Sequence, residues 1–111
     1  MIVNIKEIES ENIDLAMKKS DKIIIDFFTK WCPSCRMVAM NLEEFEENHP
    51  EVLIIQIDAG EYKTLTDLYK VKTAPTLLFF KNGNYLDRHQ GFIETEEITN
   101  NKKELWNRFL F

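Results

Sequence analysis

The stretch FFTKWCPSCR, residues 27–36, contains both cysteines of the chain, two residues apart. An apolar segment of β-type residues, 23–28, leads into it and is interrupted only by Asp26. A helical pattern follows, because apolar residues recur at i, i+4 and i+7 from Val38. The cysteines therefore lie where a buried strand gives way to the start of a helix. Unpaired backbone N–H groups and the positive end of the helix dipole favour an anion there, and a cysteine supplies one as a thiolate, the reactive form in thiol–disulfide exchange.

Length and composition indicate one globular domain spanning residues 1–111. The net charge of −5 argues against nucleic acid or an anionic membrane as the main partner. No apolar run approaches the roughly 18 residues of a membrane-spanning helix. Residues 1–7 lack the features of a signal peptide, so we expect a cytoplasmic protein. In that compartment, a single C-x-x-C pair indicates redox chemistry and not a structural disulfide framework.

The remaining patterns alternate between strands and helices. We expect strands at residues 1–5, 23–28, 52–57, 77–80 and 85–90, and helices at 10–20, 32–48, around 65–69 and from 95 onward. The segment 23–28 shows no polar alternation, which is typical of a central strand buried on both faces. Asn82-Gly83 predicts a tight type I′ hairpin turn. The order β-α-β-α-β-α-β-β-α indicates an α/β domain with helices covering a mixed sheet.

Particular residues mark the outer helices. Ser10 is the expected N-cap of the first helix, with Glu11 in its first turn and an apolar face of Ile13, Ala16 and Met17. The final helix is expected to carry Ile98, Leu105, Trp106 and Phe109 into the core. The apolar faces of these two helices are expected to pack against the sheet.

Asp26 is unusual because it stands between apolar residues in a strand expected to be buried on both faces. Desolvation raises the pKa of such a carboxyl, and a neutral acid that can release its proton is suited to act as a general base for a nearby thiol. The residues alone leave a second interpretation open, in which Asp26 lies at a strand end and reaches solvent.

A metal site is the rival use of paired cysteines. A closed zinc site requires four ligands, and only His49 and His89 could supplement the two sulfurs. The pattern places His49 at the surface end of a helix and His89 in a strand, so we expect no metal site within one chain.

Several motifs together resemble the thioredoxin family over essentially the whole chain: Asp26-Phe27, Trp31-Cys32-x-x-Cys35, Ile57-Asp58, Ala74-Pro75-Thr76, residues 80–83 (FKNG) and Gly91. The resemblance implies a thioredoxin fold, with a central mixed sheet of about five strands flanked by about four helices. It also implies a cis Ala74–Pro75 bond beside the cysteines.

The resemblance further implies roles for these residues. Cys32 would attack a substrate disulfide, Cys35 would resolve the mixed disulfide, and Asp26 would serve Cys35 as base. Trp31 would cover the dithiol, and the client-binding surface would comprise Trp31, Pro33, Ser34, Ala74, Pro75 and Gly91, although a simple turn glycine remains the alternative for Gly91. The chain has no Gly-rich dinucleotide motif and needs no bound organic cofactor, so electrons would arrive from a flavin- and NADPH-dependent thioredoxin reductase.

Two departures from the family pattern affect the chemistry. The middle dipeptide is Pro33-Ser34, whereas Gly-Pro is the commonest form; Pro33 removes one N–H donor while the Ser34 hydroxyl can add another, so the sequence does not give the sign of the change in redox potential. The lysine that many thioredoxins place near the buried acid aligns with Ile54. Without that cation we expect Asp26 to hold its proton more tightly.

These observations predict a monomeric cytoplasmic protein that reduces protein disulfides in cell redox homeostasis. Two alternatives keep the fold: a thiol oxidant, isomerase or glutathione-fed oxidoreductase, and a non-enzymatic redox-switch or metal-binding module.

Overall fold

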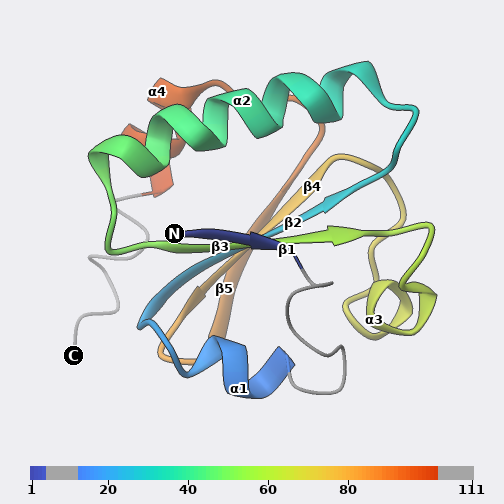
Figure 1. Cartoon of the computed structure of the whole chain (residues 1–111), viewed down its shortest axis with the longest axis horizontal. Coiled ribbons are helices and arrows are strands. Elements are labelled where there is room, and N and C mark those ends of the chain that lie inside the picture. Colours follow the sequence, from blue (N-terminus) through green and yellow to red (C-terminus); the bar gives the residue numbers. More distant parts are fainter. Residues whose placement is uncertain (5–12, 103–111) are drawn as a thin grey trace.

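The computed structural model describes residues 1–4 and 13–102, which form one five-stranded sheet with helices on both faces (Figure 1). The strands are β1 (Ile2–Asn4), β2 (Lys22–Phe28), β3 (Leu53–Asp58), β4 (Thr76–Lys81) and β5 (Asn84–Gln90). The helices are α1 (Ile13–Met17), α2 (Pro33–Asn48), α3 (Lys63–Leu68) and α4 (Thr95–Glu97), the last continuing as a π-helical turn over Ile98–Lys102. The predicted order of elements and the mixed α/β fold are confirmed.

The sheet has the order β1-β3-β2-β4-β5, so β2 lies at its centre. Strands β1, β3 and β2 run parallel, whereas β4 is antiparallel to β2 and β5 is antiparallel to β4. In this register Asp26 of β2 stands opposite Gln56 of β3. The carboxyl ends of the parallel strands β2 and β3 therefore point toward the end of the sheet where α2 begins.

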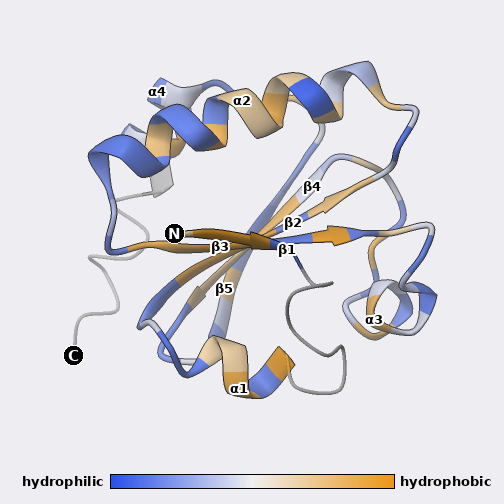
Figure 2. Cartoon of the chain, in the orientation of Figure 1, coloured by the Kyte–Doolittle hydropathy of each residue, from blue (hydrophilic) through white to orange (hydrophobic). Residues whose placement is uncertain are grey.

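Alternate residues of β2 pack into two separate cores, one on each face of the sheet. Ile23 and Ile25 pack in the core on the side of α1 and α3, whereas Ile24 packs in the core under α2. Figure 1 shows α2 and α4 on one face and α1 and α3 on the other. In Figure 2 the hydrophobic colour gathers in the inner strands, whereas the edge strand β5 is mainly hydrophilic. The predicted burial of β2 on both faces is confirmed, because all residues 23–27 are buried.

The hairpin between β4 and β5 follows the sequence prediction. Asn82 and Gly83 have φ values of 52° and 80°, as a type I′ turn requires of both central residues. Asn tolerates this region better than most residues, and Gly adopts it without steric cost.

The outer helices differ from prediction in their extent. The helix α1 ends at Met17, three residues before the expected end, although Ile13, Ala16 and Met17 are buried as predicted. In α3 the core contact comes from Leu65, since Leu68 is 66% exposed. The last helix gives way to a π-helical turn after Glu97, and Ile98 is buried. The predicted contributions of Ser10, Glu11, Leu105, Trp106 and Phe109 lie outside the described residues.

Candidate active site

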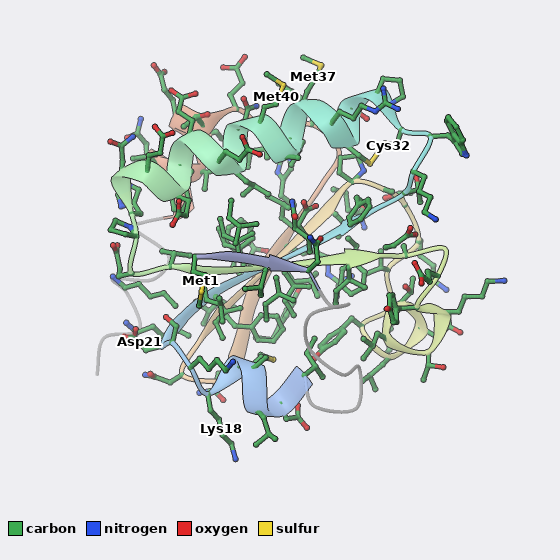
Figure 3. All side chains as sticks on the ribbon, in the orientation of Figure 1. Met1, Lys18, Asp21, Cys32, Met37 and Met40 are labelled. Carbon is green, nitrogen blue, oxygen red and sulfur yellow. A yellow bond between two sulfur atoms is a disulfide. The ribbon has the colours of Figure 1, made fainter. Side chains whose placement is uncertain are left out.

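The two cysteines form a disulfide at the first turn of α2 (Figure 3 labels Cys32). Cys32 is the N-cap of the helix, and the Cys35 N–H donates to the Cys32 Sγ with N and S 3.2 Å apart. Pro33 occupies the first helical position, where its missing N–H has no intrahelical partner to lose. Cys35 is only 3% exposed, whereas Cys32 is half-buried. Of the two sulfurs, Cys32 is therefore the more accessible to a second molecule.

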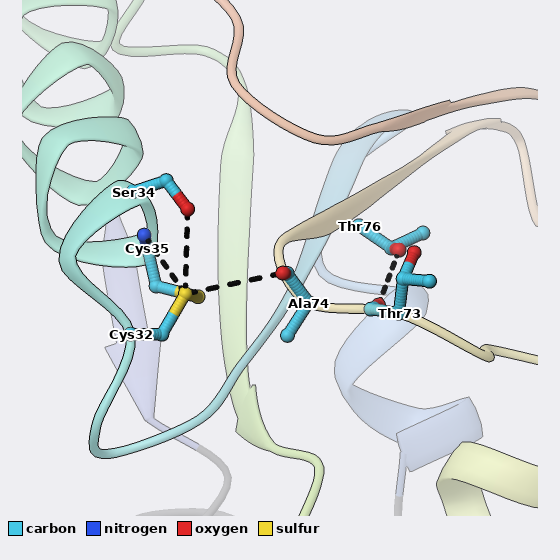
Figure 4. Close-up of a disulfide and its surroundings, with 6 residues drawn as sticks. All are labelled: Cys32, Ser34, Cys35, Thr73, Ala74 and Thr76. Atoms are coloured by element: carbon cyan, nitrogen blue, oxygen red, sulfur yellow. Dashed lines mark hydrogen bonds between the residues drawn. A yellow bond between two sulfur atoms is a disulfide. The ribbon is translucent and has the colours of Figure 1, made fainter.

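A loop from a distant part of the chain lies against this disulfide. The Ala74–Pro75 peptide bond is cis, as the resemblance implied. The Ala74 carbonyl oxygen lies 3.9 Å from the Cys32 Sγ, and Figure 4 shows the two facing each other. The loop is tied to its surroundings because the Thr76 hydroxyl donates to the Thr73 carbonyl at 2.7 Å.

Gly91 lies beside the same loop. Its N–H donates to the Pro75 carbonyl at 2.8 Å, and its φ of +91° is one that other residues rarely adopt. The fold thus brings together the start of α2, the residues before β4 and the end of β5. Of the residues predicted to form the site, Cys32, Ala74, Pro75 and Gly91 therefore lie together.

Asp26 is buried below the disulfide, and the interpretation in which it reaches solvent is excluded, since the residue is 1% exposed. Neither of its carboxyl oxygens has a hydrogen-bond partner among the described residues. Burial raises the pKa of Asp26 from its ordinary value of 3.8 to about 7. The Gln56 side chain opposes this shift in pKa to a smaller degree, although it makes no hydrogen bond of ordinary geometry with the carboxyl.

A cavity of about 360 Å³ joins the buried acid to the second cysteine. Its lining includes Asp26, Cys35 and Gln56, with Lys30 and Arg36 among the remaining residues. A volume of this size accommodates water, and the carboxyl offers that water an acceptor. The predicted transfer of a proton between Cys35 and Asp26 through water has a space in which it can occur.

Position 54, where the family pattern has a lysine, gives the buried acid no counter-ion. Ile54 pairs with Ile24, two residues before Asp26, and its side chain packs in the apolar core under α2. Because side chains two apart in a strand point to the same face, Ile54 and Gln56 share a face of the sheet, and Gln56 stands directly opposite Asp26. The effect of the missing lysine on the pKa of Asp26 stays a prediction.

The residues that flank Cys32 in sequence differ in their exposure to solvent. Trp31 is 90% exposed, so its ring projects into solvent and does not cover the disulfide as predicted. Pro33 is also exposed, whereas Ser34 is half-buried with its Oγ 3.5 Å from the Cys32 Sγ. Farther along α2, Met37 and Met40 project away from the sheet (Figure 3).

Neither histidine lies in a metal-binding cluster of the described residues. His49 stacks on Phe45, and a ring nitrogen of His89 lies 2.9 Å from the Phe92 carbonyl. Within residues 1–4 and 13–102, no group of three or more His, Cys, Asp or Glu side chains could hold a metal ion. In the same part of the chain, no helix is long and apolar enough to span a membrane.

A disulfide between two cysteines at a helix start can be reduced and re-formed by exchange with other thiols. This site is that of a disulfide oxidoreductase. The family model described as thioredoxin matches residues 4–104. The chain is 38% identical to a thioredoxin of Chlamydia pneumoniae over 86% of its own length and 93% of that protein. It is 25% identical to a chloroplastic thioredoxin z of known structure, with a TM-score of 0.80 over 94% of this chain and 93% of the other. Mitochondrial thioredoxin 3 of Saccharomyces cerevisiae is also 25% identical, with a TM-score of 0.75 over 90% of each chain.

The chain belongs to the thioredoxin family. It is a protein disulfide reductase whose redox-active pair is Cys32 and Cys35.

Proposed function

We propose that Cys32 is the attacking thiolate of this reductase and that Cys35 is the resolving thiol. The observation that carries the proposal is the hydrogen bond from the Cys35 N–H to the Cys32 Sγ, at a helix start where an anion is favoured. The Cys32 thiolate attacks one sulfur of the client disulfide, forming a mixed disulfide and releasing the other client sulfur as a thiolate. The Cys35 thiolate then attacks the Cys32 sulfur, which closes the Cys32–Cys35 disulfide and releases the second client sulfur.

Asp26 is the base that receives the proton of Cys35 in the second step. A carboxyl with a pKa of about 7 is matched to this task at neutral pH, because it can be ionised before the transfer and neutral after it. The shared cavity supports transfer through water. After the disulfide closes, the proton returns from Asp26 to solvent.

The client binds as an extended chain beside Ala74. No backbone hydrogen bond of Ala74 is found within the described residues, so its N–H and C=O are available to pair with a client strand. The neighbouring Pro75 and Gly91 give this surface its shape, and Trp31, Pro33 and Ser34 border it on the side of α2. This arrangement presents the client sulfur to Cys32.

Electrons reach the disulfide from a flavin- and NADPH-dependent thioredoxin reductase, and the protein acts as a monomeric electron carrier in the cytoplasm. The absence of a Gly-rich dinucleotide motif from the sequence supports a protein donor. A cytoplasmic setting is supported by the direction of the reaction, since reduction of clients requires a compartment that keeps thiols reduced.

The test is turnover of insulin disulfides with NADPH and a thioredoxin reductase, followed by NADPH absorbance. We expect sustained turnover with the wild-type chain and none above background with Cys32→Ser. Cys35→Ser should instead accumulate a mixed disulfide that non-reducing gels detect and that reductant removes, because the first step remains possible. Activity with reduced glutathione but not with the reductase would overturn the proposed donor, and an intact Cys32→Ser activity would overturn the role of Cys32.

A further inference from the structure

We infer that the Ser34 hydroxyl is a further catalytic group, which donates a hydrogen bond to the Cys32 sulfur and stabilises it as a thiolate. The inference rests on the proposed role of Cys32 as the attacking sulfur. It assigns Ser34 a function in the chemical step, in addition to its place at the border of the client surface.

The direction of this hydrogen bond follows from the redox state of the site. The Ser34 Oγ and the Cys32 Sγ lie 3.5 Å apart, and in general either group could donate (Figure 4). Cys32 is in a disulfide, so its sulfur carries no proton. The hydroxyl is therefore the donor.

The hydroxyl of Ser34 is committed to this sulfur. Serines near a helix start commonly bond to backbone groups of their own turn. Among the described residues, the Ser34 side chain instead has the Cys32 Sγ as its hydrogen-bond partner. Ser34 is half-buried, which limits the ability of water to replace the hydroxyl.

The other groups around the Cys32 sulfur make this donor important. Pro33 has no N–H to offer, and among the residues that the structure describes the Cys35 N–H and the Ser34 hydroxyl are the two donors at this sulfur. The Ala74 carbonyl oxygen faces the same sulfur at 3.9 Å, and its negative end disfavours a thiolate. Lys30 and Arg36 carry positive charge nearby in sequence, but both are exposed to screening by solvent.

A hydrogen bond to an anion is stronger than one to a neutral sulfur. The Ser34 hydroxyl therefore favours the Cys32 thiolate over both the thiol and the disulfide, and it lowers the pKa of Cys32. It acts when Cys32 attacks the client and again when Cys32 leaves as a thiolate during re-reduction. A lower pKa also reduces the nucleophilicity of each thiolate, with a Brønsted coefficient of about 0.4–0.5.

The test is the pH profile of alkylation of the reduced full-length chain by iodoacetamide, with the modified cysteine identified by mass spectrometry. Ser34→Ala should raise the pKa of Cys32 by about one unit, which is the scale of one hydrogen bond to a charged group. The alkylation rate should then fall about threefold below the wild-type pKa and rise about threefold above the new one, so that the two profiles cross. Iodoacetamide does not use the client surface, so loss of a client contact would not produce this crossing.

Two further variants complete the experiment. Ser34→Thr keeps the hydroxyl and should restore the wild-type profile. Ser20→Ala is the matched control, because the Ser20 hydroxyl donates to the Lys22 and Glu51 carbonyls and to no sulfur. Its profile should equal that of the wild type.

An unchanged profile in Ser34→Ala, or equal shifts in Ser34→Ala and Ser34→Thr, would overturn the inference. Insulin reduction by the wild-type chain separates this failure from failure of the proposed function. If the wild type reduces insulin while Ser34→Ala has an unchanged profile, only the role of Ser34 is wrong. If the wild type does not reduce insulin, the proposed function fails whatever the profile shows.

Discussion

Lys81 and Asp26 are both buried in the same sheet, and their surroundings differ. Lys81, at the end of β4, is 4% exposed and its ammonium lies 3.2 Å from the Asp21 carboxylate. Asp26, in the adjacent strand β2, is 1% exposed and its carboxyl has no hydrogen-bond partner among the described residues. Lys81 thus has a counter-ion that reaches it from the surface, whereas Asp26 faces a cavity.

The difference separates a buried charge with a stabilising partner from a buried carboxyl for which we propose a role in the reaction. The hydrogen bond from Lys81 lowers the pKa of Asp21, so this carboxylate stays charged at neutral pH. Burial instead raises the pKa of Asp26 to about 7, which costs stability whenever the carboxyl is ionised. A group that destabilises the fold and has access to Cys35 through a cavity is better explained by proton transfer than by packing.

The largest expected effect comes from Asp26→Asn. Because the folded pKa of Asp26 lies above 3.8, the folded chain binds more protons between pH 4 and pH 7, and its stability falls as pH rises through that window. The variant has no carboxyl at position 26, so its stability does not fall with pH for this reason. The free energy of unfolding of the variant relative to the wild type should therefore increase by about 4 kcal/mol between pH 4 and pH 8.

Denaturant unfolding of both oxidised proteins across this pH range measures the effect. The pH dependence of the difference is the readout, since the buried amide of the variant adds a constant cost at every pH. A difference that does not change with pH would show that Asp26 titrates as an exposed carboxyl does.

A smaller effect is expected from Gln56→Lys. This variant would place a counter-ion beside Asp26, just as Asp21 is the counter-ion of Lys81. A cation opposite Asp26 should lower the pKa of that carboxyl by about 1–2 units, and NMR titration of the side-chain carboxyl carbon measures it. Ile54→Lys is the matched comparison: position 54 pairs with Ile24 and lies one step along the same face from Asp26, so a lysine there should lower the pKa of Asp26 less than one at position 56. A pKa of Asp26 that stays at about 7 in Gln56→Lys would contradict the observed register.

The smallest effect is expected from Asp21→Asn. The Asp21 side chain is 56% exposed, so solvent screens the pair, and removing the charge should lower the free energy of unfolding by about 1 kcal/mol at neutral pH. The pKa of Asp21 is lowered in the folded state, so its contribution is present above pH 3.8 and lost as pH falls below that value. Unfolding at pH 7 and at pH 2 should show the difference shrinking, and a difference that grows in acid would contradict this account.

Much of the fold follows from local sequence patterns. The apolar run of β2, which does not alternate and is interrupted only by Asp26, predicted burial on both faces, and Asn82-Gly83 predicted the hairpin that the φ values confirm. Likewise, the position of Cys32 before a helical pattern placed it at a helix start. These predictions succeed because periodicity, turn geometry and helix ends depend on neighbours within a few residues.

The site depends on distances that no local pattern contains. The approach of Ala74 to Cys32, 42 positions earlier in the chain, comes from the order of strands in the sheet. The exposed position of Trp31 depends on how the loop before α2 leaves the sheet.

The amino-acid sequence by itself determined the elements, their order and a reactive cysteine pair at the start of a helix, because each of these depends on local geometry and on the burial of apolar faces. The tertiary structure alone decided which distant residues meet at the site: Gln56 opposite Asp26, and the Ala74 carbonyl beside the Cys32 sulfur. The physical reason is that a strand pattern repeats every two residues, so it fixes a face but leaves the register to long-range pairing.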